Sequence, residues 1–229
     1  MTIEIYADGA SVDGILELNK NPIITGFTTN PTLMKKAGIT DYRGFAKEVL
    51  SKVKDKPISF EIFSDYFEEM YKQAKEISSW APNVFVKIPY YNTEGVSMSG
   101  LIKILVAEGV KINLTAVFSY EQIKRAIKDI GNEESIISVF AGRISDAGYD
   151  PRSFIEYAKY NKYPRQKILW ASTREVWNIK HAEDCGADII TVGHDILKKY
   201  LSEKKDLELY SLDTIRMFYD DAVASGFTL

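Results

Sequence analysis

The run V-F-V-K-I-P at residues 84–89 alternates two kinds of side chain, as a β-strand with two different faces does. Val84, Val86 and Ile88 share one face, and Lys87 lies in the middle of the other. Longer amphipathic stretches separate this run from the β-rich runs before and after it. Short strands that alternate with helix-sized segments predict a parallel sheet.

The same alternation continues along most of the chain. Apolar residues recur at three and four positions within 120–130, which predicts an amphipathic helix that Ser119 can cap. Strands are predicted at 3–8, 26–30, 57–64, 84–90, 111–119, 135–142, 167–173 and 189–194. Eight such units in 229 residues predict an α/β protein, a single (β/α)8 TIM barrel whose one catalytic domain spans 1–229.

An open doubly wound sheet is the rival architecture, and no G-x-G-x-x-G turn follows the first predicted strand to support it. A last amphipathic stretch at 211–224 follows the eighth strand. It predicts an additional C-terminal helix, which either closes the bottom of the barrel or contacts a neighbouring subunit.

Composition argues against several classes of protein. The 29 basic and 32 acidic residues are spread along the chain, with a net charge of -3, so nucleic acid is not expected as a partner. No apolar stretch reaches membrane-spanning length and no signal segment opens the chain, so we expect no membrane and a cytoplasmic location. Cys185 is the only cysteine, and His181 and His194 lack metal-ligand spacing, so neither a disulfide nor a metal is expected.

Polar residues share one face of the predicted strands. If the apolar faces pack on the helices, the other faces converge in the barrel lumen, near the strand C-termini where barrel enzymes keep their chemistry. This set is Asp8, Glu61, Lys87, Asn113, Thr115, Ser138, Trp170 and Ser172. A purely structural ion-pair cluster is one reading, but desolvating a charge costs several kcal/mol, which favours binding or catalysis.

Lys87 is the candidate nucleophile of this set. A lysine attacks a carbonyl only as the free amine, and apolar surroundings disfavour the ammonium form. A protonated Schiff base at C2 of a ketose would act as an electron sink, so that the C3–C4 bond can break without a metal. Asp8 and Glu61 are the candidate proton carriers, against the simpler readings of Asp8 as a cap and of Glu61 as charge balance.

Five ordered motifs within residues 3–197 resemble transaldolases, especially the short form, and the related fructose 6-phosphate aldolases. They are G-F-T-T-N-P-T-L (26–33), A-P-N-V-F-V-K-I-P (81–89), G-V-K-I-N-L-T-A-V-F-S (109–119), S-V-F-A-G-R-I-S-D-A-G (138–148) and W-A-S-T-R (170–174). The resemblance implies a cofactor-independent homo-oligomer of carbohydrate metabolism, in the pentose phosphate pathway. It would move a dihydroxyacetone unit from a ketose phosphate, such as fructose 6-phosphate or sedoheptulose 7-phosphate, to an aldose phosphate.

The resemblance also implies a role for each matching residue. Lys87 would form the Schiff base and Asp8 would be the acid/base, while Glu61 and Thr115 position a water. The residues that would bind the sugar and its phosphate are Asn30, Asn113, Ser138, Phe140, Arg143, Ser172 and Arg174. Without the resemblance, the two arginines read as ordinary surface charges.

Two positions bear on which reaction is run. The aldolase branch has glutamine where Glu61 stands and tyrosine where Phe140 stands, so this chain is predicted to transfer the unit instead of releasing it. A class I aldolase acting on a related sugar and a non-catalytic sugar-phosphate-binding barrel are the alternatives. Val139, the bulky Trp170 beside the expected phosphate site and the Gly193-His194 pair depart from the family pattern, which leaves the acceptor and the sugar length open.

Overall fold

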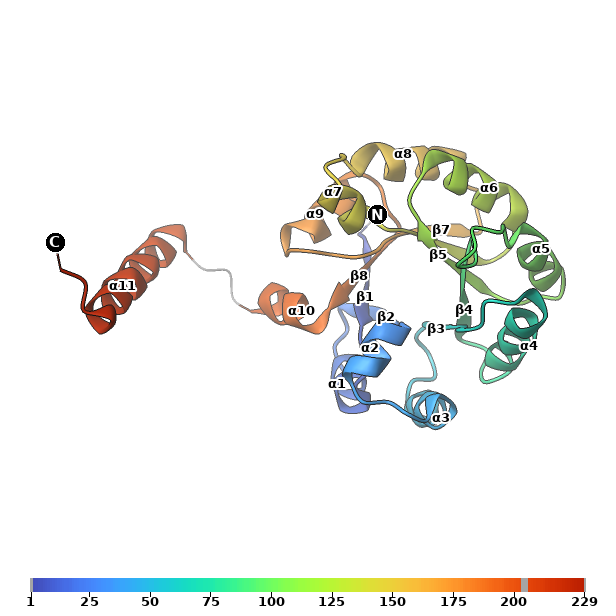
Figure 1. Cartoon of the computed structure of the whole chain (residues 1–229), viewed down its shortest axis with the longest axis horizontal. Coiled ribbons are helices and arrows are strands. Elements are labelled where there is room, and N and C mark those ends of the chain that lie inside the picture. The colour runs from blue at the N-terminus through green and yellow to red at the C-terminus, as the bar shows by residue number, and fades with distance from the viewer. Residues whose placement is uncertain (1, 203–205, 229) are drawn as a thin grey trace. The chain divides into compact units, whose positions relative to one another are not determined.

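In the computed structural model, which describes residues 2–202 and 206–228, eight parallel strands close into a barrel in chain order (Figure 1). The strands are β1 (Glu4–Asp8), β2 (Ile24–Thr28), β3 (Ile58–Glu61), β4 (Val84–Pro89), β5 (Ile112–Val117), β6 (Ser135–Val139), β7 (Gln166–Trp170) and β8 (Ile189–Gly193). The predicted TIM barrel is confirmed, and the open sheet is wrong because β1 pairs with β8.

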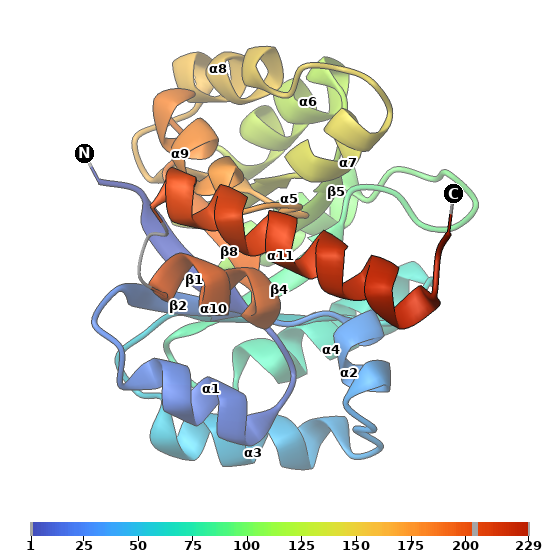
Figure 2. The ribbon, with the colours of Figure 1, turned by 90° about the vertical axis from the view of Figure 1, so that its left-hand side faces the viewer.

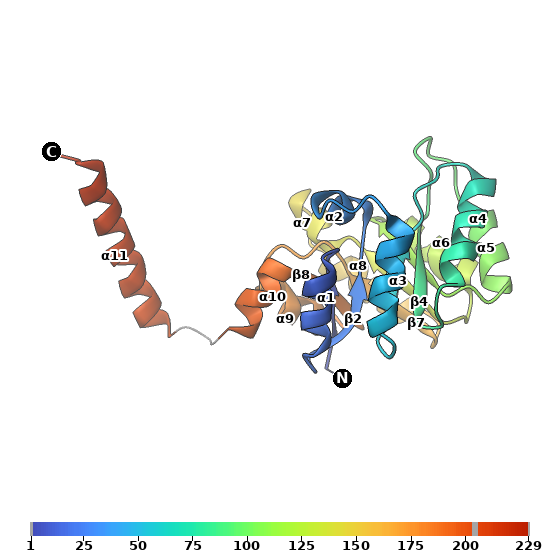
Figure 3. The same cartoon turned by 90° about the horizontal axis from the view of Figure 1, so that it is seen from below.

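The helices are α1 (Val12–Asn19), α2 (Pro31–Lys36), α3 (Tyr42–Lys52), α4 (Phe67–Ser78), α5 (Ser99–Ala107), α6 (Tyr120–Ile130), α7 (Ala141–Asp146), α8 (Arg152–Asn161), α9 (Trp177–Asp184), α10 (His194–Leu201) and α11 (Leu207–Ser225). Most of those between successive strands lie around the outside of the barrel (Figure 1). Ser119 caps α6 as predicted, in a capping box with Gln122. The short helices α2 and α7 lie at the end of the barrel opposite the N-terminus (Figure 3).

Several strands end earlier than the sequence predicts, because the β-rich residues continue past the point where the backbone leaves the sheet. Ala141 already begins α7, directly after β6 and Phe140. Ala116 near the end of β5 and Ser172 after β7 have φ values of 56° and 67°, in the left-handed region that non-glycine residues rarely adopt. The strand C-termini are therefore where side-chain directions depart from simple alternation.

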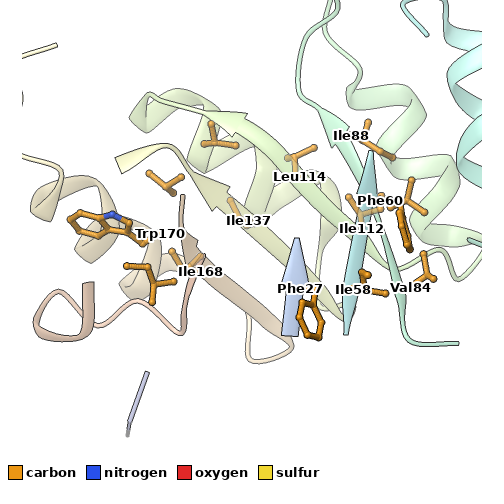
Figure 4. Packing of buried hydrophobic residues seen from close by; sticks show 14 of the residues in the cluster. Phe27, Ile58, Phe60, Val84, Ile88, Ile112, Leu114, Ile137, Ile168 and Trp170 are labelled. Carbon is orange, nitrogen blue, oxygen red and sulfur yellow. The ribbon is translucent and has the colours of Figure 1, made fainter. Parts of the chain in front are cut away.

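The outer faces of the strands form the main hydrophobic core with the surrounding helices. Figure 4 shows this packing, in which the buried side chains of neighbouring strands lie side by side, from Phe27 and Ile58 through Val84 and Ile112 to Ile168. A second, smaller cluster fills the lumen. It consists of Tyr6, Phe85, Ile136, Leu169, Ala171 and Ile189. Most of these residues precede a polar lumen residue by two positions, so the inner face changes from apolar to polar towards the strand C-termini.

The prediction that Trp170 faces the lumen is wrong. Its ring belongs to the outer core and lies 4.9 Å, centroid to centroid, from the ring of His181 on α9. Leu169 of β7 and Ala171 directly after it point inward instead, so the inner face is apolar here. The polarity of the residues therefore does not indicate which face of β7 lines the lumen. Because Trp170 lies on the far face of the strand, it does not fill the lumen side of the expected phosphate site.

The chain divides into two compact units, one extending to Leu197 and one beginning at Lys198. The second contains the confirmed C-terminal helix, α11, which is longer than the predicted stretch at 211–224 and forms one continuous helix (Figure 2). None of its residues is buried. That residues 1–229 act as one catalytic domain stays a prediction. Among the described residues, no helix combines the length and apolarity needed to cross a bilayer.

Candidate active site

A cavity of about 430 Å³ opens at the C-terminal ends of the barrel strands. Its lining includes every predicted site residue except Asn113 and Arg174: Asp8, Asn30, Glu61, Lys87, Thr115, Ser138, Phe140, Arg143 and Ser172. The structure thus brings together residues that lie up to 164 positions apart in the sequence, from Asp8 to Ser172. Strand closure places them on one inner surface.

Lys87 is buried, with 7% of its surface exposed, although it lines this cavity. Its Nζ atom lies 2.9 Å from the backbone oxygen of Thr29 and 3.2 Å from Oε2 of Glu61. The amine is therefore held by a hydrogen bond on one side and by an ion pair on the other. Glu61 is also close enough to accept the proton that the amine must lose before it can attack a carbonyl.

Asp8 lies at the end of β1 and receives a hydrogen bond of 2.8 Å from the Thr28 hydroxyl. That hydroxyl also bonds to the hydroxyl of Thr191, so three strands contribute to one chain of contacts. Burial raises the pKa of the Asp8 carboxyl, and the opposing effects of the Lys87 charge, the Thr28 hydrogen bond and His194 do not cancel it. A carboxyl poised towards its neutral form can donate a proton as well as accept one.

Asn113 lies behind the cavity surface. It is fully buried, accepts a hydrogen bond of 2.6 Å from the Ser138 hydroxyl and donates one of 2.9 Å to the Ser59 hydroxyl. Ser138 lines the cavity, so in this arrangement Asn113 orients the hydroxyl that a ligand would meet.

The Thr115 hydroxyl is buried at the cavity and has no hydrogen-bond partner in the described part of the chain. Buried hydroxyls in native proteins nearly always have a partner, and the usual explanation of an exception is a water or a ligand. Thr115 is therefore suited to hold a water or a substrate hydroxyl.

The two predicted phosphate-binding arginines differ in their surroundings. Arg143 lines the cavity, lies 5.4 Å from the centroid of the Phe140 ring and makes no ion pair with any described residue. Arg174 does not line the cavity, and its Nε atom donates to both carboxylate oxygens of Asp146, at 2.9 and 3.2 Å. Its guanidinium charge is thus already paired.

Ser172 reaches the cavity because of its left-handed backbone, which turns the chain after β7. The turn lies against α7: a Cβ atom added to Gly142 would stand 1.6 Å from the Ser172 carbonyl oxygen. Only glycine allows this approach, which brings the segment that carries Ser172 against the helix that carries Arg143.

Sequence reasoning missed the hydroxyls of Thr28 and Thr191, which support Asp8 and line the cavity. Asn30 was selected by the resemblance, but strand alternation within 26–30 would have placed Thr28 on the same face as Asn30, two residues earlier. The part of the chain that the structure describes contains no group of three or more histidine, cysteine, aspartate or glutamate residues placed to hold a metal ion.

Residues 5–228 match the family model described as Transaldolase/Fructose-6-phosphate aldolase. The chain is 35% identical over 202 residues to a probable transaldolase of Dehalococcoides mccartyi, covering 87% of this chain and 90% of that protein. It is 36% identical over 200 residues to a probable transaldolase of Methanococcus maripaludis, covering 86% and 89%. A probable transaldolase of Brucella ovis is 35% identical over 219 residues, covering 92% and 96%.

A more distant likeness is to the crystal structure of orotidine 5′-monophosphate decarboxylase from Metallosphaera sedula. It has a TM-score of 0.55 and 17% identity and covers 89% of this chain and 92% of that one. At this identity the likeness supports the barrel fold alone.

The raised pKa of Asp8 predicts how the protein's stability depends on pH. A carboxyl whose pKa is raised by folding favours the native state at acid pH, and this contribution is lost as the pH rises through the native pKa. Asp8→Asn stays uncharged, so it should increase the free energy of unfolding near about pH 7 and have little effect near about pH 4. Urea unfolding across this range measures the difference.

The matched control is Asp220→Asn at an exposed position of α11, which should show no such pH-dependent gain. A loss of stability in Asp8→Asn at neutral pH would contradict the burial argument.

Proposed function

The chain belongs to the transaldolase/fructose-6-phosphate aldolase family, and on this premise we propose that it transfers a dihydroxyacetone unit from a ketose phosphate to an aldose phosphate through a Schiff base on Lys87. The observation that carries the proposal is the Lys87 amine, which lies between Glu61 and the Thr29 carbonyl inside the cavity that Asp8 also lines. A binding protein would have no need of a desolvated amine with two carboxyl groups beside it.

The proposed reaction begins when the free amine attacks C2 of the ketose and the C2 oxygen leaves as water. Asp8 then takes the proton of the C4 hydroxyl as the C3–C4 bond breaks, and the bonding electrons move into the protonated Schiff base to form an enamine. An aldehyde leaves. The reverse steps on an acceptor aldehyde make the new bond, and Asp8 returns its proton to the new hydroxyl.

The water that is lost and later returned needs a place beside Lys87. Glu61 lies 3.2 Å from the amine, and the Thr115 hydroxyl lies at the same cavity without a partner among the described residues. We assign these two groups to positioning and deprotonating that water.

Phosphate recognition falls first to Arg143 and Ser172, because both line the cavity and Arg143 makes no ion pair within the described chain. A guanidinium matches phosphate geometry with paired hydrogen bonds. Arg174 would join only by exchanging Asp146 for the phosphate, since Asp146 already occupies its donors.

Transfer is favoured over free aldol cleavage by Glu61 and Phe140, which stand where the aldolase branch has glutamine and tyrosine. Phe140 lines the cavity, and its ring packs 5.3 Å from that of Phe118, centroid to centroid. Because phenylalanine has no hydroxyl, this position offers no group that could protonate the enamine. A class I aldolase on a related sugar is the second candidate, and it would use the same Lys87 chemistry.

We also propose that the protein is a cytoplasmic homo-oligomer in the pentose phosphate pathway. A reducing location suits the single cysteine, Cys185, which is buried. Association is supported by α11, on which large apolar side chains such as Ile215, Phe218 and Val223 are more than half exposed. Exposed apolar surface of this extent is typical of an interaction site.

Borohydride trapping tests the Schiff base. Incubation with fructose 6-phosphate and borohydride should add one reduced ketose-derived mass to the peptide that contains Lys87, detected by mass spectrometry. Lys87→Ala should abolish the adduct and lower transfer activity by more than about 10³-fold, because no other described group can take the role of the amine.

Lys47→Ala, which removes an exposed lysine of α3, is the control and should keep both adduct and activity. A sugar-phosphate-binding protein without catalysis would give no adduct in any of these variants.

A donor and acceptor panel tests transfer against cleavage. With fructose 6-phosphate and erythrose 4-phosphate, the wild-type protein should form more transferred product than free dihydroxyacetone. Glu61→Gln combined with Phe140→Tyr should raise the ratio of free to transferred unit by about ten-fold, equivalent to about 1.4 kcal/mol between the two barriers. Phe118→Tyr, a neighbouring ring, should leave it unchanged. Release faster than transfer in the wild-type protein would favour the aldolase.

Light scattering tests association. The full chain should have a mass of at least two times 26.0 kDa. Ile215→Asp with Phe218→Asp should lower that multiple, because charges in a buried contact are costly, whereas Asp213→Ser on the same helix should not. A monomeric wild-type protein would contradict the proposal.

A further inference from the structure

His194 is placed directly behind Asp8. Gly193 at the end of β8 is the register partner of Asp8 on β1, and His194 is the next residue, at the start of α10. Nothing in the proposed reaction uses this histidine, and Gly193-His194 is one of the segments that departs from the family pattern.

The ring of His194 sits in a slot that two glycines leave open. A Cβ atom added to Gly9 would lie 2.6 Å from Nε2 of His194, and one added to Gly14 would lie 2.6 Å from Cε1. Neither glycine has a φ value in the left-handed region, so the backbone alone does not require glycine there. Glycine is required at both positions because a Cβ atom would occupy the space of the imidazole.

The Nε2 atom of His194 is buried and has no hydrogen-bond partner within the described residues. Leaving a buried nitrogen unpaired is unfavourable, so packing alone is a poor reason for a histidine at this position, where an apolar ring would fit without that penalty. A charge on the ring does have an effect here: it lowers the pKa of Asp8 and opposes the effect of burial.

Other charged groups lie around these two residues. The charge of Lys87 on β4 and the hydrogen bond from the Thr28 hydroxyl on β2 also lower the pKa of Asp8. The acidic residues on the elements beside the imidazole are Asp13 and Glu17 of α1 and Asp195 of α10. Positive charge on Lys87 and on His194 therefore favours the ionised form of Asp8. In the proposed reaction the charge at Lys87 persists in the protonated Schiff base and is lost when the enamine forms.

We propose that His194 is a positioning residue for Asp8: its imidazole, seated between Gly9 and Gly14, holds the turn that follows Asp8 and, when protonated, stabilises the carboxylate that accepts the C4 hydroxyl proton. The inference rests on the proposed function, because it concerns the proton carrier of that reaction. It gives the site a second source of positive charge, one that does not depend on Lys87 when the protonated Schiff base becomes a neutral enamine.

The test is the pH profile of kcat/KM for fructose 6-phosphate with erythrose 4-phosphate. His194→Phe keeps a ring of similar width but removes the charge, so Asp8 should be ionised less at acid pH. We expect kcat/KM to fall roughly three- to ten-fold on the acid limb of the profile and to change little on its alkaline side. His181→Phe on α9 is the matched control and should leave the profile unchanged.

Unfolding measurements test the seat of the ring without substrate. Gly14→Ala should lower the melting temperature of the wild-type protein, because the new methyl group meets the imidazole. In a His194→Ala background the same change should be neutral or stabilising, since the next neighbour of that methyl group is Cβ of Ser11 at 3.5 Å. An equal loss of melting temperature in both backgrounds would overturn the described position of the imidazole against Gly14.

The two proposals fail in different ways. If Lys87 is trapped in the wild-type protein but His194→Phe has the wild-type pH profile, the role of His194 is wrong and the Schiff-base function stands. If no adduct forms, the proposed function is wrong, and the interaction between His194 and Asp8 can still be tested by unfolding without substrate. His194→Phe should then alter the pH dependence of the free energy of unfolding in the wild-type background and not in the Asp8→Asn background. The same effect in both backgrounds would overturn the interaction.

Discussion

The site is organised around one desolvated cation. Removing the Lys87 ammonium from water costs several kcal/mol, and the barrel offsets this cost by supplying the Thr29 carbonyl and the Glu61 carboxylate from the two preceding strands. These partners are fixed in turn, since the Thr29 hydroxyl donates to the Ser59 carbonyl and the Tyr42 hydroxyl donates to the Glu61 carbonyl. The position of the amine is therefore set by the closure of the strands.

The lumen is built in two layers that give this cation its access. Tyr6, Phe85 and Ile136 fill the lower layer, and each precedes a polar residue of the upper layer on the same strand. The apolar layer separates the cavity from the N-terminal end of the barrel. The cavity is therefore reached from the strand C-termini, where Asp8, Lys87 and Ser138 line it.

Backbone strain is concentrated where the chain leaves the regular sheet beside the cavity. Ala116 and Ser172 have left-handed backbones at the ends of β5 and β7, and Ser172 lies against Gly142 at the start of α7. Such conformations are unfavourable unless the surrounding structure holds them, and they are enriched at functional sites. Here they turn Ser172 into the cavity and bring its segment against the helix that carries Arg143.

The sequence by itself determined the barrel and most of the cavity lining, because strand alternation has a period of two and Lys87, Glu61 and Asp8 follow it. Polarity did not predict which face of β7 points inward, because both Leu169 and Trp170 are apolar. Trp170 was therefore assigned to the lumen although it packs outward. Only the tertiary structure decided that Asp146 pairs with Arg174, that Asn113 lies behind Ser138, and that His194 lies next to the register partner of Asp8. These contacts join residues distant in sequence, and no local period encodes which side chain meets which across a closed barrel.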